Sequence, residues 1–490
     1  MTSGVALRHL AATELRVHWR HGLLPATGAM TTVWALVLLT VPRAWRAPAL
    51  PWVLLLDLAA LGLFFAPALA VVERANGVPA ALGLTRLSPA RALTVRIAAL
   101  AATALGAALV LVLATGAATV AVGPVLLGAL LTSALLSLLA TVLLGRRDTL
   151  TAYMARLPGV GVVLLLPALI SGTGLGDHAV LWLSPATGAL QLLSGRWSWA
   201  ATGWITVWLA VLWWRAAAIG FGEAHSRGAP PPAPHPLAPL GPLRGTGHWR
   251  AVRSFARVDR RTLLDDRLLL LLVAGVPLLA LGGRWLAGPG LGEVQARIGL
   301  DLAPHLPVVW ALVLVLHTPV MFGAVAGLLF LEDRDAGVLP AIALTPAALG
   351  TLLVYRLSAA AAATAAGVAL GLTVAGAAHP TGPAGVLATA VAAGAVALVP
   401  ALLMAALVRD RAQGMALMKA LGVPLYLPLA GWYLEGPAAW LFVVIPTSWA
   451  VRAFWAQSAP AAAAFAAAAI GAGALVAALV LPRLRRSLLR

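Results

Sequence analysis

A carboxylate followed by an arginine, with a glycine three residues further on, occurs twice in this sequence. The two copies are Glu73-Arg74-x-x-Gly77, followed by Thr85, and Asp333-Arg334-x-x-Gly337, followed by Thr345. A carboxylate beside an arginine can bridge to another protein or cap its own helix. An ordinary solvated loop is the alternative. Two copies favour a docking role, because polar connecting segments otherwise vary freely.

Two further ionisable residues lie inside apolar runs. Asp57 stands in Leu-Leu-Leu-Asp-Leu-Ala, and His317 stands 260 residues later in Val-Leu-His-Thr-Pro. A charged side chain in the middle of a bilayer costs about 2.5–3.5 kcal/mol on insertion scales, so such residues are functional candidates. One hypothesis pairs Asp57 with His317 as opposite charges inside the membrane. In the other hypothesis the two residues do not meet, and each one forms hydrogen bonds within its own helix bundle.

Several kinds of chemistry are excluded or disfavoured. The chain has no cysteine, which excludes disulfides and thiolate metal sites, and its ten histidines show no ligand spacing. The single lysine, Lys419, lies between Met418 and Ala420, so the chain contains no P-loop. Asp265-Asp266 lacks a second carboxylate cluster, which disfavours a metal-dependent membrane transferase. We therefore expect a chain that is not an enzyme and that binds no metal or cofactor itself.

The composition predicts the elements that position these residues. Of the 490 residues, 61% are hydrophobic and 10% are charged, and the mean hydropathy is +0.94, whereas soluble domains carry about 25% charged residues. A spanning helix needs about 20 mostly apolar residues. The fold class we predict is an all-α polytopic membrane protein with about twelve spans. Their ranges are 23–41, 50–72, 94–118, 123–144, 157–172, 199–221, 268–287, 307–331, 352–376, 384–408, 420–434 and 461–481.

Arginine placement predicts the orientation. Most arginines fall near the two termini and in every second segment between spans, and the alternate segments hold only a few. Because cytoplasmic loops carry the excess of Lys and Arg, both termini are predicted to be cytoplasmic. The net charge of +18 is then explained by topology and by contact with anionic membrane lipids, rather than by nucleic acid.

The chain repeats itself at an offset of about 260 residues. Arg96 matches Arg356, and Pro185 matches Pro446 at an offset of 261, besides the two polar signatures. Six spans per half give both halves the same orientation, so we predict a pseudo-two-fold axis along the membrane normal. The predicted domains are 1–227, a linker at 228–247 with seven prolines, and 248–490.

Each half is expected to carry two elements that do not span the bilayer. A polar, amphipathic helical stretch precedes each first span, and we predict that it lies in the membrane interface. The fifth and eleventh spans are short, and half-apolar stretches at 173–198 and 435–460 follow them, with Pro185 and Pro446 inside.

At this point the pattern resembles the membrane subunits of ABC-2-type exporters, and most of all actinobacterial export permeases for drugs or natural products, the fluoroquinolone type, with two halves fused. The resemblance implies that the loop between spans two and three docks into an ATPase subunit, and that re-entrant hairpins on the outer side follow each fifth span. Glu73, Arg74, Gly77 and Thr85, with Asp333, Arg334, Gly337 and Thr345, are then the coupling residues. The second and fifth spans of that family line the interface between the halves. The resemblance therefore implies that Asp57 and His317, if they pair, lie beside the translocation path, where they gate the path or contact a cationic substrate. The first copy departs from the pattern, since Arg86 stands where the second has Pro346.

The expected function is therefore export of small amphipathic molecules across a bacterial plasma membrane. Two copies of a separate ATPase are the expected partners, and they would bind ATP and Mg²⁺. An ATPase-independent antiporter is one alternative, and an ABC exporter of lipid or glycan is another.

Overall fold

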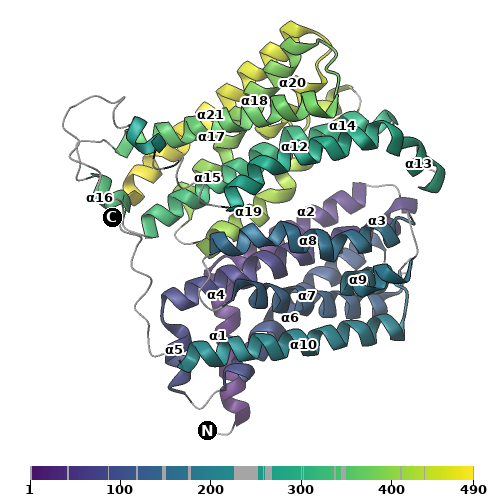
Figure 1. Cartoon of the computed structure of the whole chain (residues 1–490), viewed down its shortest axis with the longest axis vertical. Coiled ribbons are helices and arrows are strands. Elements are labelled where there is room, and N and C mark those ends of the chain that lie inside the picture. The colour runs from purple at the N-terminus through teal and green to yellow at the C-terminus, as the bar shows by residue number, and fades with distance from the viewer. Residues whose placement is uncertain are drawn as a thin grey trace. The chain divides into compact units, whose positions relative to one another are not determined.

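The computed structural model is helical, with no strand among the residues that it describes (Figure 1). These residues are 3–40, 43–85, 88–116, 120–145, 150–174, 178–225, 252–257, 259, 267–298, 301, 303–335, 338–343, 349–408, 411–434 and 436–488. Gly337, Thr345 and the predicted linker at 228–247 lie outside them. The all-α prediction is confirmed.

The chain forms two compact units, each with its own set of contacts. The first contains Met1–Ala233 together with Met415–Val423, and the second contains Pro234–Gly414 together with Pro424–Arg490. A short segment that carries Lys419 and the first residues of the predicted eleventh span therefore belongs to the first unit.

The first unit is built around helices that correspond to the first six predicted spans. In chain order its elements are α1 (Ser3–Arg20), α2 (Leu23–Thr40), α3 (Arg43–Ala60), the π-helix η1 (Leu61–Phe65), α4 (Ala66–Ala75), α5 (Val78–Gly83), α6 (Pro89–Thr115), α7 (Val122–Leu144), α8 (Leu150–Gly172), the 3₁₀-helix η3 (Ala179–Leu183), α9 (Pro185–Leu193) and α10 (Trp199–His225). The start of α6 shows why these ranges become helices. Ser88 caps its N-terminus, with Pro89 as the next residue, and this is the order that favours a helix start.

The second unit contains the remaining helices. Its elements are α12 (Arg267–Ala287), α13 (Pro289–Ile298), η4 (Ala303–His305), α14 (Leu306–Trp310), the π-helix η5 (Ala311–Leu316), α15 (His317–Asp335), α16 (Val338–Ala343), α17 (Leu349–Ala375), α18 (Pro383–Leu407), the two ends of α19 (Arg411–Tyr426), η6 (Leu427–Tyr433), η7 (Gly436–Trp440), α20 (Thr447–Trp455) and α21 (Ala459–Leu488). In Figure 1, α17, α18 and α21 lie alongside one another, as their contacts also show. Each of the twelve predicted ranges coincides with helix.

Length and composition identify many of these helices as membrane spans. Within the described residues, nine helical stretches are long and apolar enough to cross a bilayer. A tenth would be α1 with α2, which meet at a bend of 66°. The apolar part of α8 is shorter, at Gly159–Gly172. The chain is therefore a multi-pass membrane protein, while twelve crossings and their two-fold arrangement stay predictions.

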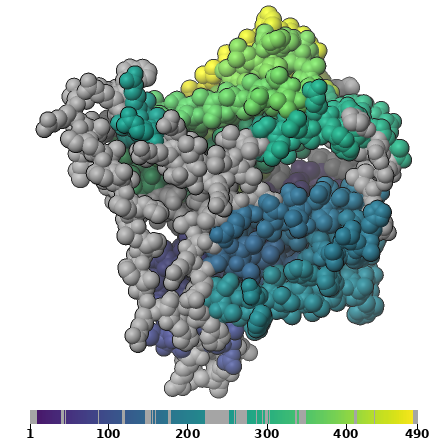
Figure 2. All heavy atoms as spheres, viewed as in Figure 1, coloured from purple at the N-terminus to yellow at the C-terminus, as the bar shows by residue number. Residues whose placement is uncertain are grey.

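Outward-facing side chains agree with this assignment. Helices α8 and α10 contribute to the blue-to-teal surface of the first unit in Figure 2. Val163, Val207 and Trp214 on them are 74%, 53% and 64% exposed. Apolar side chains on an outer surface are what a lipid-facing helix requires.

In each unit the second span packs directly against the fourth through a glycine. A Cβ atom on Gly62 would lie 2.6 Å from the Leu136 Cβ, and one on Gly323 would lie under 3.0 Å from the Ala397 carbonyl oxygen. Gly62 and Gly323 are 261 residues apart, as are Leu136 and Ala397. The repeat therefore extends to the packing of the spans.

Candidate functional site

A cluster of charged side chains joins three elements at one end of the first unit. Arg96, on α6, forms an ion pair with Glu73 at the end of α4. Its Nε atom also lies 3.8 Å from the Glu14 carboxylate on α1. All three side chains are less than one-fifth exposed. One arginine thus holds the polar helix α1, the second span and the third span together.

The second unit builds the same cluster. Arg356, on α17, forms an ion pair with Asp333 on α15, and its Nη2 atom lies 3.4 Å from Asp259. The guanidinium also lies 5.7 Å from the centre of the Phe330 ring, within the range of a cation–π contact. Arg356 is 260 residues after Arg96. In both units, therefore, an arginine of the third span pairs with a carboxylate at the end of the second span.

The arginine of each signature also binds inside its own unit. Arg74 donates a hydrogen bond to the Gly145 carbonyl oxygen just after α7. Arg334 donates one of 2.6 Å to the Val408 carbonyl oxygen just after α18. An arginine at a helix C-terminus satisfies carbonyl groups that the helix leaves unpaired and is favoured by the helix dipole. Both signatures therefore tie the second span to the ends of other spans.

The rest of the first signature segment is exposed. Gly77 adopts a positive φ of 70° between α4 and α5, which glycine accommodates readily. Leu84 is 91% exposed, and the Thr85 hydroxyl donates to the Leu82 carbonyl oxygen at 2.8 Å. The surface that this loop offers is thus Leu84 with its neighbours, while Glu73 and Arg74 hold the loop in place.

Burial shifts the pKa values of two groups on α1, the polar helix that precedes the first predicted span at 23–41. Burial raises the pKa of Glu14, and the charge of Arg96 opposes this shift. Burial, followed by the charge of Arg96, lowers the pKa of His18 to about 4. His18 is fully buried, and neither ring nitrogen has a hydrogen-bond partner among the described residues. Near neutral pH, His18 is therefore uncharged.

Asp57 has a partner that the sequence reasoning did not identify. Its carboxylate lies 3.2 Å from the Lys419 ammonium on α19, with side chains 1% and 2% exposed, respectively. Lys419 also lies 3.5 Å from the Asp57 carbonyl oxygen and 6.0 Å from the centre of the Phe65 ring. A signal was available, because the only lysine of the chain adjoins an apolar run.

His317 likewise has a partner within its own unit. Its Nδ1 atom lies 3.0 Å from the Tyr426 hydroxyl oxygen at the end of α19. The structure thus gives Asp57 and His317 different partners, Lys419 and Tyr426, which neither hypothesis named. Both residues lie next to a π-helix in their second span: η1 begins four residues after Asp57, and η5 ends just before His317. Single π-helical turns are frequent at functional sites.

A short helix follows the fifth predicted span in each half. Pro185 is the first residue of α9, and Pro446 immediately precedes α20. Ser184 donates a 2.6 Å hydrogen bond to the Leu164 carbonyl oxygen on α8. Thr447 donates one of 2.7 Å to the Leu425 carbonyl oxygen on α19. Each short helix is thus fastened to the short span before it.

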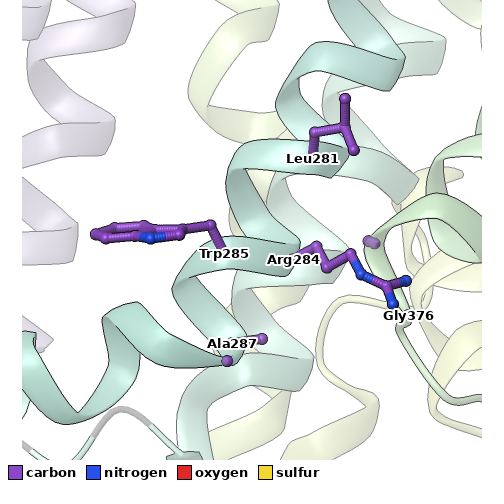
Figure 3. Close-up of a pocket in the computed structure, with 7 residues that line it drawn as sticks. Leu281, Arg284, Trp285, Ala287 and Gly376 are labelled. Carbon is purple, nitrogen blue, oxygen red and sulfur yellow. The ribbon is translucent and has the colours of Figure 1, made fainter.

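A pocket of about 550 Å³ opens between the ends of α12 and α17. In Figure 3, Arg284 points toward Gly376 while Trp285 points away from it. The Arg284 Nη1 atom donates to the Val374 carbonyl oxygen at 3.3 Å, so the guanidinium caps α17. None of the charged clusters above lines this pocket, and we assign it no role in transport.

Comparison with known proteins identifies similar chains. Residues 259–483 match a family model described as "Fluoroquinolones export permease protein Rv2686c-like". Two similar proteins are the fluoroquinolones export permease proteins of Mycobacterium tuberculosis strains CDC 1551 / Oshkosh and ATCC 25618 / H37Rv. Each is 32% identical over 211 residues, which are 43% of this chain and 83% of the relative. Each relative is therefore about half as long as this chain.

Proposed function

Because the chain belongs to the fluoroquinolone export permease family, we propose that it is the membrane permease of an ATP-driven drug exporter. It moves small amphipathic molecules outward across a bacterial plasma membrane, with both termini in the cytoplasm. Two copies of a separate ATPase bind ATP and Mg²⁺ and perform the hydrolysis. This chain supplies the path and the coupling surfaces.

The fusion of two permease halves is supported by lengths and by geometry. The relatives are about half as long as this chain, and the family match begins at residue 259. Arg96 pairs with Glu73, and Arg356 pairs with Asp333 at the equivalent positions of the second half. We propose that domains 1–227 and 248–490 correspond to two separate subunits of a half-sized relative, joined by 228–247.

The duplicated cluster is the observation that carries the coupling mechanism. Arg96 and Arg356 each join the second span, the third span and the polar stretch before the first span. A push on the loop between the second and third spans is then transmitted to all three elements as one body. A partly buried charge network resists shear, because separating its members removes favourable ion pairs from a site with limited access to water. ATPase closure on these loops would thus move the spans that carry Asp57 and His317.

Substitution of exposed leucines tests whether the loop between the second and third spans binds the ATPase. We expect the purified chain, co-expressed with its ATPase, to have the native mass of one permease and two ATPases. Leu84→Glu places a charge on the proposed surface and is expected to weaken ATPase association and lower export. Leu183→Glu is the matched control, because Leu183 is also exposed, at 64%, but precedes the outer helix α9. Equal effects of the two changes, or none from Leu84→Glu, would exclude docking at this loop.

The buried Asp57–Lys419 pair is the observation that favours the alternative, a proton-coupled antiporter, because it places an ionisable carboxylate inside the spans. The same preparation separates the two functions. Export that needs ATP and the ATPase supports the exporter. Export by the chain alone, driven by a proton gradient, supports the antiporter.

A further inference from the structure

We propose that Asp57 and Lys419 form a binding site for the transported molecule, and that this molecule is a zwitterion with one ammonium and one carboxylate group. The inference rests on the proposed export function and adds its substrate class. In the structure the two side chains neutralise each other. A zwitterion enters by replacing this contact with two contacts of its own.

Stability alone gives little reason for this pair. Its two side chains are almost completely buried, and their charged atoms lie 3.2 Å apart. Removing two charges from water costs several kcal/mol per ion, and well-packed apolar residues are often at least as stable in their place. Ionisable residues inside membrane spans are therefore functional candidates with a named partner, and here the partner is the only lysine of the chain.

The pair is also incompletely satisfied, as a binding site must be. Apart from Lys419, neither carboxylate oxygen of Asp57 has a hydrogen-bond donor among the described residues. A charged carboxylate accepts several such bonds. Lys419, in contrast, keeps the Asp57 carbonyl oxygen and the Phe65 ring nearby if the carboxylate moves away. A ligand ammonium thus finds free acceptor positions, and a ligand carboxylate finds a held ammonium.

The helices on both sides depart from regular α-helix within about a turn of the pair. The π-helix η1 begins four residues after Asp57, and the Tyr153 hydroxyl donates to the Leu63 carbonyl oxygen within it. Pro424 stands inside α19 five residues after Lys419, where it removes one backbone hydrogen bond. Such irregular turns are where spans bend most easily, so the two charges can separate without unwinding a whole span.

The physics of the pair selects the substrate class. A singly charged cation can bind Asp57 but leaves Lys419 buried without a counter-charge, and a single anion leaves Asp57 in that state. An unpaired buried charge is strongly unfavourable, so either ligand binds more weakly than a zwitterion of the same shape. The site therefore selects a zwitterion because a cation or an anion would leave one buried charge unpaired.

Uptake into inverted vesicles, whose cytoplasmic face is outside and which contain the permease and its ATPase, tests the proposal. The probes are a fluoroquinolone with a free carboxylate and a free piperazine amine, its ethyl ester, which is cationic, and its N-acetyl derivative, which is anionic. We expect the wild type to transport the zwitterion at least about tenfold better than either derivative, given the cost of one unpaired buried charge.

Neutral variants should change this preference in opposite directions. Lys419→Gln is expected to favour the cationic ester, and Asp57→Asn the anionic derivative. The double variant, which buries no charge, is expected to lose the preference and to keep its elution volume in size-exclusion chromatography. Ser133→Ala, which removes another buried polar group, is the control and should retain the wild-type order of probes.

Other outcomes overturn the proposal. A double variant that still prefers the zwitterion shows that the pair does not read substrate charge. Single variants that reduce all three probes by the same factor show a structural pair. If the wild type exports none of the probes when ATP is supplied, the exporter function itself fails, and this result is distinct from the other two.

Discussion

The glycine that brings the second span of each half against the fourth allows a quantitative prediction. In Gly323→Ala, the new Cβ atom would lie under 3.0 Å from the Ala397 carbonyl oxygen and 2.5 Å from the Pro400 Cγ. A helix carbonyl and a proline ring cannot rotate away as a flexible side chain can. The two spans must therefore move apart, at a position only six residues after His317.

The magnitude follows from two opposing effects. Overpacking a well-packed site costs about 1–3 kcal/mol, while alanine in place of glycine favours a helix by about 1 kcal/mol. Because the Ala397 carbonyl oxygen and the Pro400 ring cannot yield, the cost of overpacking should lie in the upper part of its range, about 2–3 kcal/mol, which leaves a net loss of about 1–2 kcal/mol for Gly323→Ala. At about 2–4 °C for each kcal/mol in a unit of this size, the Tm should fall by roughly 2–8 °C.

Thermal unfolding in detergent, followed by the loss of the monodisperse peak, measures this change. Gly106→Ala, on α6, is the matched control, because nothing lies within 4 Å of its added Cβ. The control should keep or raise the Tm. Equal Tm values for Gly323→Ala and Gly106→Ala would refute the close packing of these two spans, and with it the repeat seen at Gly62.

Two further predictions concern the charged clusters. Arg356→Gln leaves Asp333 and Asp259 without their shared cation, so we expect at least about a tenfold loss of export, with ATPase binding retained. Arg356→Lys should recover part of the lost export. If Arg356→Gln abolished ATPase binding, this result would contradict a positioning role. His18 has a folded-state pKa of about 4, below its unfolded value of 6.5, so protonation favours unfolding and stability falls as the pH is lowered through this window. The wild type should lose about 2 kcal/mol more than His18→Gln between pH 7 and pH 5 in denaturant titrations, and parallel titration curves would exclude a buried neutral histidine.

Much of the helical architecture followed from local features of the chain. Apolar runs of about 20 residues predicted the spans, and helices occupy all of these ranges. Polar signatures at a constant offset predicted a duplication, and Arg96 and Arg356 occupy equivalent positions in it. The docking role of Thr85 and the outer hairpins at Pro185 and Pro446 stay predictions. For Glu73 and Asp333, the structure shows contacts inside each unit.

The partners of the buried charges did not follow in the same way. Asp57 and Lys419 are 362 residues apart, and His317 and Tyr426 are 109 residues apart. The internal repeat had aligned Asp57 with His317, which suggested that these two residues pair. A repeat relates equivalent positions in two halves, and such positions need not touch.

Composition and periodicity are properties of neighbouring residues, so the sequence alone determines them. They predicted an all-helical membrane protein with an internal repeat and without a P-loop. An ion pair depends on which faces of distant helices meet, and a change of one residue turns a helix face by about 100°. Packing contacts such as those of Gly62 and Gly323 choose among these faces. The assignment of Lys419 to Asp57, and of Tyr426 to His317, was therefore settled only when the helices were packed.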